Sequence, residues 1–244
     1  MTDFKNRIRS DWPSVLRGVL DKARALGGPA LLAFDLDSTL FDNRPRQARI
    51  LREFGAARKV SALTRCAAEH WVSGWDMKAA MVACGLSSSE AEGLYRDAKA
   101  FWLERFFTSE YCVDDVPIAG APEYLREVVE TGATVAYVTG RHEAMRVGSV
   151  ESMRKAGMAT PGGKVHLLMK PTFQMTDDDW KREAHARLGA LGTLIAAFDN
   201  EPTHVNDYAR QFPDALAVHL ATDHSGRPVE ILEHVVSVPH FDLP

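Results

Sequence analysis

Two aspartates separated by one residue are the first feature of the chain that could carry out chemistry. Asp35 and Asp37 directly follow the apolar run 30–34, and Ser38 and Thr39 come next. Carboxylates this close repel each other unless something neutralises them. A divalent cation such as Mg²⁺ does so, since it binds carboxylate and backbone oxygens. The segment predicts a strand ending in a metal site with a nucleophilic carboxylate. The alternative is a solvated turn closed by an aspartate side chain.

Polar residues also follow three later apolar runs. The ends of these runs are marked by Thr139-Gly140-Arg141, by Lys170 and by Asp199-Asn200. Open parallel sheets bind ligands beyond the carboxyl ends of their strands, so these groups are expected at one edge, where they could hold a cation and a phosphate. Each also has a plainer interpretation, as a turn, a solvated lysine and a helix cap before Pro202.

The elements that would position these groups follow from hydrophobic patterning. Five short apolar runs have the composition of strands buried on both faces, and helical patterns separate most of them. They are residues 30–36, 134–139, 164–169, 193–198 and 215–220. This order predicts an α/β fold with a Rossmann-like, doubly wound parallel sheet. A first helix carries the apolar positions Leu16, Val19, Leu20, Ala23 and Leu26 and should end at Gly27.

A long helical insertion separates the first two predicted strands. Ser87 and Glu90 form a capping box before an apolar stripe, and Asp76 can cap a shorter helix that Gly85 ends. We expect a helical cap domain over residues 44–115, with residues 1–43 and 116–244 forming the catalytic core.

Together, the polar segments resemble the motifs of the haloacid dehalogenase superfamily, most of whose members are Mg²⁺-dependent phosphatases. The segment 35–39 resembles the first motif, 139–141 the second and Asp199-Asn200 the fourth, across about residues 30–210. Asn200 stands where a second aspartate is common. The insertion falls where this superfamily places its C1 caps.

The third motif is a lysine, for which the sequence offers Lys170 and Lys181. Met169-Lys170-Pro171, then the acidic run 177–179, then Lys181, is similar to the arrangement in polynucleotide-end phosphatases and acid phosphatases of the superfamily. We therefore prefer Lys181 as the motif lysine and leave Lys170 as the alternative.

The resemblance implies a role for each residue. Asp35 would be the nucleophile and form an aspartyl-phosphate, and Mg²⁺ would be bound by Asp35, the Asp37 carbonyl and Asp199. Asp37 would serve as acid and then base, which favours an oxygen leaving group. Thr139, Gly140 and the lysine would contact the phosphoryl oxygens. A phosphomonoesterase is expected, with a phosphotransferase or mutase, or a non-catalytic phosphate-binding protein, as alternatives.

Composition excludes several partners. The net charge of −4 and the lack of a basic block give no sign of nucleic acid or membrane binding. Three widely spaced cysteines, Cys66, Cys84 and Cys112, suit reduced thiols, and their spacing indicates no metal site. No apolar N-terminal segment is visible, so a cytoplasmic protein is expected.

A small phosphorylated substrate is expected, and the oligomeric state is left open. Specificity should lie in the cap, for which the candidates are Lys59, Arg65, His70, Trp71 and Trp75.

Overall fold

The computed structural model describes residues 4–244, which divide into two compact units. Of the described residues, the first unit comprises 4–41, 117–143 and 153–244, and the second comprises 42–116 and 144–152. The second unit thus includes a segment after residue 143 that the expected cap of 44–115 leaves out. That these units act as catalytic core and cap stays a prediction.

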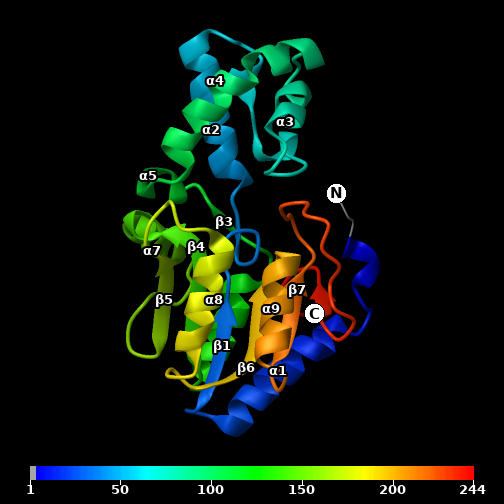
Figure 1. Ribbon diagram of the computed structural model, residues 1–244, viewed down its shortest axis with the longest axis vertical. Coiled ribbons are helices and arrows are strands. Elements are labelled where there is room, and N and C mark those ends of the chain that lie inside the picture. The colour runs from blue at the N-terminus through cyan, green and yellow to red at the C-terminus, as the bar shows by residue number, and fades with distance from the viewer. Residues whose placement is uncertain (1–3) are drawn as a thin grey trace. The chain divides into compact units, whose positions relative to one another are not determined.

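The first unit is built on a six-stranded parallel sheet with the order β5-β4-β1-β6-β7-β8 (Figure 1). All five predicted strands are present, as β1 (Ala30–Phe34), β4 (Thr134–His142), β5 (Val165–Lys170), β6 (Thr193–Asp199) and β7 (Leu216–Leu220). The expected α/β, Rossmann-like class is confirmed. The edge strand β8 (Val236–Val238) was not predicted, because three residues are too few to show a pattern.

Helices cover both faces of this sheet. On one face lie α8 (Asp177–Leu188) and α9 (Pro202–Gln211), and on the other lie α1 (Trp12–Leu26) and α6 (Ala121–Glu130). The first strand, β1, is completely buried because it packs on both layers. Its side chains alternate between the two faces of the sheet. Leu31 and Ala33 pack among residues of α8 and α9. Phe34 stacks on Phe198, with ring centroids 4.5 Å apart.

The ends of α1 follow the prediction only in part. The helix stops at Gly27, whose φ of 63° is a conformation that glycine adopts readily. Leu16, Val19, Leu20 and Ala23 are buried, but Leu26 is 41% exposed, so its expected place on the apolar face is wrong. The last turn has passed the edge of the surface that the helix covers.

The second unit is helical. Its helices are α2 (Arg44–Arg58), α3 (Met77–Ala83), α4 (Ser88–Phe106) and α5 (Ser109–Cys112), with short 3₁₀ turns η2 (Leu63–Arg65) and η3 (Ala68–His70). Asp76 caps α3, and Ser87 and Glu90 form the predicted capping box of α4. These caps satisfy amides that the first turn of a helix leaves without partners.

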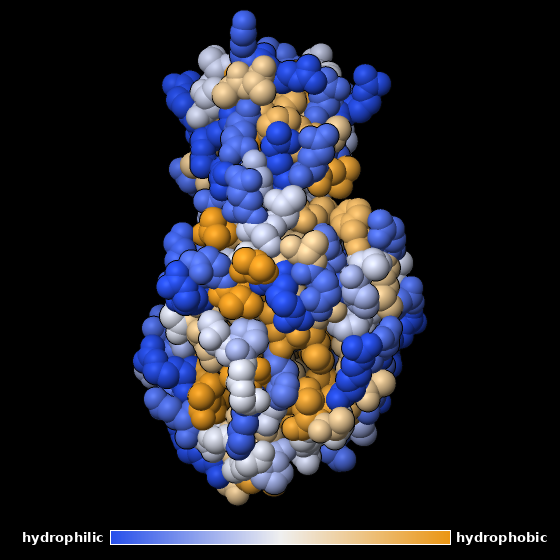
Figure 2. Space-filling model, turned by 90° about the vertical axis from the view of Figure 1, so that its left-hand side faces the viewer, coloured by the Kyte–Doolittle hydropathy of each residue, from blue (hydrophilic) through white to orange (hydrophobic). Residues whose placement is uncertain are grey.

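The remaining elements are short. They are η1 (Phe4–Arg7), η4 (Glu143–Met145), α7 (Arg146–Lys155) and the two-stranded sheet of β2 (Phe41–Asp42) and β3 (Val116–Pro117). Figure 2 shows apolar side chains interspersed with polar ones on the side of the molecule where β5 forms the sheet edge. Within the described residues, the helices all lack the length and hydrophobicity needed to cross a bilayer.

Candidate active site

Three buried charged side chains meet at the carboxyl edge of the sheet. The Lys181 Nζ donates to Asp35 Oδ1 at 2.7 Å and to Asp199 Oδ2 at 2.8 Å. Asp35, Lys181 and Asp199 are 7%, 2% and 1% exposed. The predicted carboxylates therefore do converge, and one ammonium bridges them.

The backbone explains why these residues meet. β1 and β6 are neighbours in register, with Phe34 opposite Phe198, so Asp35 and Asp199 leave adjacent strands at the same level. The amide of Asp35 also donates to the Phe198 carbonyl at 2.9 Å. On α8, the indole of Trp180 donates to the Thr139 carbonyl at 2.8 Å, which fixes the rotation of the helix and directs the next residue, Lys181, towards both aspartates.

The electrostatics of this trio follow from burial and from the excess of one carboxylate. Burial and the nearby Asp199 raise the pKa of Asp35 to about 7, although Lys181 opposes the shift. Burial alone would raise the pKa of Asp199, but Lys181 and His204 outweigh it and lower that pKa. The two carboxylates raise the pKa of Lys181 despite its burial. A single ammonium thus neutralises only one carboxylate, and an added cation would favour ionised Asp35.

Asp37 is held by an arginine. The Arg141 Nε donates to Asp37 Oδ2 at 3.0 Å, and its Nη2 donates to Oδ1 at 2.6 Å. The next residue, Ser38, has a φ of 58°, so the chain turns sharply after Asp37. The Arg141 side chain is 1% exposed, whereas the Asp37 side chain is 31% exposed. The carboxylate of this ion pair is therefore accessible to solvent, and its arginine partner is not. The sequence placed Arg141 in a motif, but no pattern indicated its partner.

The predicted strand end at Thr139 is wrong, because β4 continues to His142 and its pairing with β5 shifts in register between Thr139 and His142. Thr139 and Gly140 therefore lie inside β4, near its carboxyl end. Thr139 is fully buried, and its Oγ1 accepts a hydrogen bond from the Arg141 amide at 3.2 Å. A Cβ atom on Gly140 would lie 2.7 Å from a carboxylate oxygen of Asp177, so only glycine fits here without displacing that side chain. This part of β4 is therefore packed tightly against the start of α8.

The two candidate lysines have different partners. Lys170 Nζ donates to Asp177 Oδ1 at 2.6 Å, and the Asp177 side chain is 54% exposed. Lys181, by contrast, contacts only buried carboxylates in the bonds described above. The geometry therefore places Lys181 beside Asp35, and Lys170 beside the acidic start of α8.

A second layer of polar residues surrounds Asp199, which no sequence pattern indicates. The Glu201 amide donates to Asp199 Oδ1 at 2.9 Å, and the His204 Nδ1 lies 3.8 Å from the same oxygen. His204 Nε2 also lies 2.8 Å from Asp178 Oδ1, and Arg227 pairs with Asp178 at 2.8 Å. Contacts with Asp199 and Asp178 raise the pKa of His204 against the effect of burial. This network fixes the orientation of the Asp199 carboxylate.

Asn200 has a bridging position. Its Oδ1 accepts from the Thr39 hydroxyl at 3.1 Å, and its Nδ2 donates to the Asp223 carbonyl at 2.6 Å. The amide therefore joins the turn after β1 to the segment after β7. A carboxylate could not donate the second of these bonds.

The donor set suits a hard divalent cation. Asp35 and Asp199 supply carboxylate oxygens that both contact the Lys181 ammonium. When both carboxylates are ionised, the net charge of these three side chains is −1. Mg²⁺ prefers oxygen ligands of this kind. The residues present therefore fit the expected Mg²⁺, with Asp35, Asp199 and the Asp37 carbonyl as the ligands the sequence predicts.

The predicted specificity residues lie in the helical unit. Trp71 is a core residue at 1% exposure, whereas Trp75 is 66% exposed. Lys59 and Arg65 are exposed, and His70 is half-buried beside two cysteines. A role of these residues in binding substrate stays a prediction.

Comparison with known proteins rests on structure, because no family model and no curated protein matches the sequence. The fold is similar to Protein Tyrosine Kinase A of Mycobacterium tuberculosis, with a TM-score of 0.53, 19% identity and coverage of 88% of this chain and 95% of that one. It is also similar to a candidate phosphatase from Clostridium difficile, with a TM-score of 0.50, 9% identity and coverage of 82% and 88%. With its parallel sheet and its inserted helices, the chain shares the fold of these two proteins.

Proposed function

We propose that this protein is a Mg²⁺-dependent phosphomonoesterase that acts on a small phosphorylated metabolite through an aspartyl-phosphate on Asp35. The observation that carries the proposal is the buried contact of Lys181 with both Asp35 and Asp199, beside the more accessible Asp37. Phosphoryl transfer needs a nucleophile, a cation-binding carboxylate, a fixed ammonium and an acid–base group. All four lie at one edge of the sheet.

In the first step, a carboxylate oxygen of Asp35 attacks phosphorus and the bond to the leaving-group oxygen breaks. Asp37, in its protonated form, gives its proton to that oxygen, so that an alcohol departs. In the second step, Asp37 takes a proton from water as the water oxygen attacks phosphorus, which releases phosphate and restores Asp35. Two easier displacements thus replace one difficult hydrolysis.

Other residues of the chain stabilise these steps. The Lys181 ammonium, fixed by two carboxylates, offers positive charge next to the oxygen of Asp35 that reacts. Arg141 orients Asp37 through two hydrogen bonds. A bound Mg²⁺ would supply charge neutralisation between the carboxylates and the phosphate. We assign Thr139 and Gly140 to phosphate binding because they lie near the carboxyl end of β4, at the same sheet edge.

Hydrolysis of a generic aryl phosphate tests the proposal. Activity should disappear with EDTA and return with Mg²⁺. Asp35→Asn should lose roughly 10³-fold or more in turnover, because the amide is a poor nucleophile. Asp21→Asn is the matched control, since this aspartate is an exposed residue of α1 whose side chain is 74% exposed. Full activity in metal-free buffer, or near-normal turnover of Asp35→Asn, would show that the mechanism is wrong.

Asp37→Asn separates the two steps. Because this variant lacks the base for the second step, a labelled substrate should leave phosphate attached to Asp35, detectable in a peptide by mass spectrometry. A panel of phosphorylated metabolites, scored for released phosphate with and without an added alcohol acceptor, then identifies the substrate and separates hydrolysis from phosphotransfer.

A further inference from the structure

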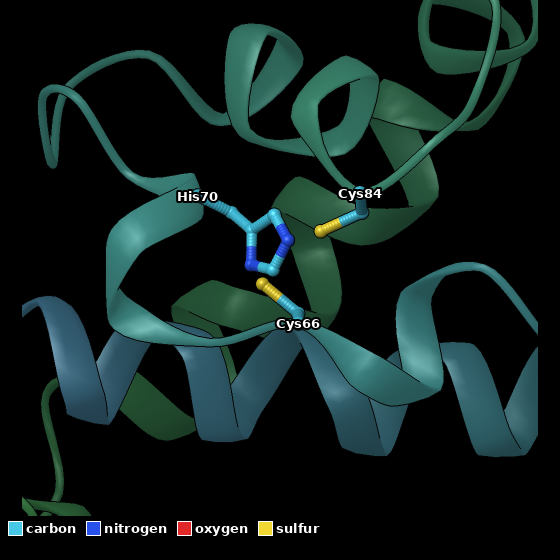
Figure 3. Close-up of side chains that lie close together, drawn as sticks. All are labelled: Cys66, His70 and Cys84. Atoms are coloured by element: carbon cyan, nitrogen blue, oxygen red, sulfur yellow. The ribbon is translucent and has the colours of Figure 1, made fainter.

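Two cysteines and a histidine converge in the helical unit, with Cys66 and His70 four residues apart and Cys84 fourteen residues after His70. Cys66 follows η2, His70 ends η3, and Cys84 follows the last residue of α3. One potential ligand atom from each lies within 4.8 Å of the other two. Figure 3 shows the imidazole ring of His70 between the two sulfur atoms. Sequence patterns do not indicate this cluster, because its spacing matches no familiar metal-binding pattern.

Backbone contacts hold the three side chains in place. The Cys66 carbonyl accepts from the Arg52 guanidinium at 2.7 Å, and its amide donates to the Leu63 carbonyl at 3.0 Å. The amide of Cys84 donates to the Ala80 carbonyl at 3.0 Å, which closes the last turn of α3. The ligands thus stand on three separately anchored turns rather than on one mobile loop.

The histidine is oriented by Ala67. Its Nδ1 accepts a hydrogen bond from the Ala67 amide at 2.9 Å and lies 3.3 Å from the Ala67 carbonyl oxygen. This leaves Nε2 as the nitrogen available to a ligand. A metal on Nε2 would move the ring proton to Nδ1, which would then give up the bond from the Ala67 amide and donate to the Ala67 carbonyl instead. A carbonyl partner of this kind is common for metal-binding histidines.

The environment of Cys66 contains groups that favour a thiolate. The Trp71 side chain and Arg52 both act to lower the pKa of Cys66. Burial and Cys84 outweigh them and raise that pKa to about 12, so the metal-free pair carries thiols. A metal that displaced the protons would give the Trp71 N–H a sulfur acceptor.

The donor types select the ion. Two sulfurs and one imidazole nitrogen suit Zn²⁺, whereas Mg²⁺ and Ca²⁺ prefer oxygen. Cys66 is buried, but His70 and Cys84 are only half-buried, so water can reach the site and complete a tetrahedral set.

We propose that Cys66, His70 and Cys84 bind one Zn²⁺ ion, with water as the fourth ligand. The ion would join η2, η3 and the end of α3, and so stabilise the packing of this part of the helical unit. The proposal is independent of the catalytic residues, none of which belongs to this cluster.

Cobalt substitution tests the site directly. The reduced, EDTA-treated full chain, with excess Mg²⁺ added back for the catalytic site, should develop thiolate-to-cobalt charge-transfer absorption that saturates at one equivalent of Co²⁺. Carboxylates at the catalytic site cannot produce this absorption. One equivalent of Zn²⁺ should bleach this spectrum and raise Tm. Since binding releases thiol protons, the Zn²⁺ affinity should increase with pH.

Cys84→Ser and Cys112→Ser form a matched pair. Cys112 belongs to the same unit but lies outside the cluster. The loss of a direct ligand in Cys84→Ser should weaken Zn²⁺ binding by at least the roughly 10–100-fold typical of an outer partner. His70→Ala should do the same, and Cys112→Ser should bind as the unmodified chain does. No charge-transfer band in the reduced protein, or unchanged affinity in both ligand variants, would overturn the proposal. So would a Cys66–Cys84 disulfide in a protein that takes up no Zn²⁺ when reduced.

Discussion

Replacement of Lys181 by methionine is the perturbation that the site geometry predicts most sharply. The change removes the ammonium and keeps most of the side-chain volume, so it isolates the loss of charge. The removed group lies 2.7 Å from an oxygen of Asp35 and 2.8 Å from one of Asp199, and Lys181 is 2% exposed. Both buried carboxylates would then face each other without their shared cation.

Two magnitudes follow. In transition-state stabilisation, loss of a fixed charge beside the transferring phosphoryl group should cost about 2–4 kcal/mol. That corresponds to a turnover lower by roughly 30-fold to 1000-fold. In stability, removing one partner of a buried ion pair costs about 3–5 kcal/mol in the absence of metal. Bound Mg²⁺ should recover part of this second loss, since it would supply positive charge to the same carboxylates.

Lys170→Met is the matched control. Its partner Asp177 is 54% exposed on the side chain, so the lost ion pair should cost no more than about 1 kcal/mol. Both variants are compared for aryl phosphate turnover at saturating Mg²⁺, and for Tm with and without Mg²⁺. A larger loss of turnover in Lys170→Met than in Lys181→Met would refute the assignment of the phosphate-contacting lysine. It would leave the roles of the aspartates untouched.

Two further predictions concern stability. Burial and Lys181 lower the pKa of His185 from 6.5 to about 4, so the unfolded chain binds the extra proton between these values, and stability should fall as pH decreases through this window. From pH 7 to pH 5 this residue should account for about 2 kcal/mol of the free energy of unfolding. Denaturant unfolding of His185→Asn should therefore show a smaller dependence of stability on pH, and an unchanged dependence would contradict this prediction. Arg46→Met should lower the free energy of unfolding by about 3–5 kcal/mol, because Arg46 and Asp115 form an ion pair at 2.9 Å with both side chains 0% exposed. Denaturant unfolding measures this loss, and an unchanged midpoint would mean that Asp115 finds another partner.

The sequence alone determined the sheet and the edge at which the polar groups lie. Doubly buried parallel strands need nearly continuous apolar runs, so the five runs showed up without knowledge of the fold. Polar residues directly after such runs must come out at the carboxyl edge, which is why Asp35, Thr139 and Asp199 could be grouped in advance. Helix signals that depend on residues close in sequence, such as the capping box of Ser87 and Glu90, could also be predicted from the sequence alone.

Only the tertiary structure decided which side chains pair. Lys181 reaches Asp35 because Trp180 fixes the rotation of α8 against β4, a contact between residues distant in the chain. The Arg141 contact with Asp37 likewise depends on how β4 and the turn after β1 meet. The Cys66, His70 and Cys84 cluster needs three separate turns to converge. Local sequence sets which elements form, because their hydrogen bonds and buried faces are local. Pairing between elements depends on register and rotation, which are fixed only when the whole core packs.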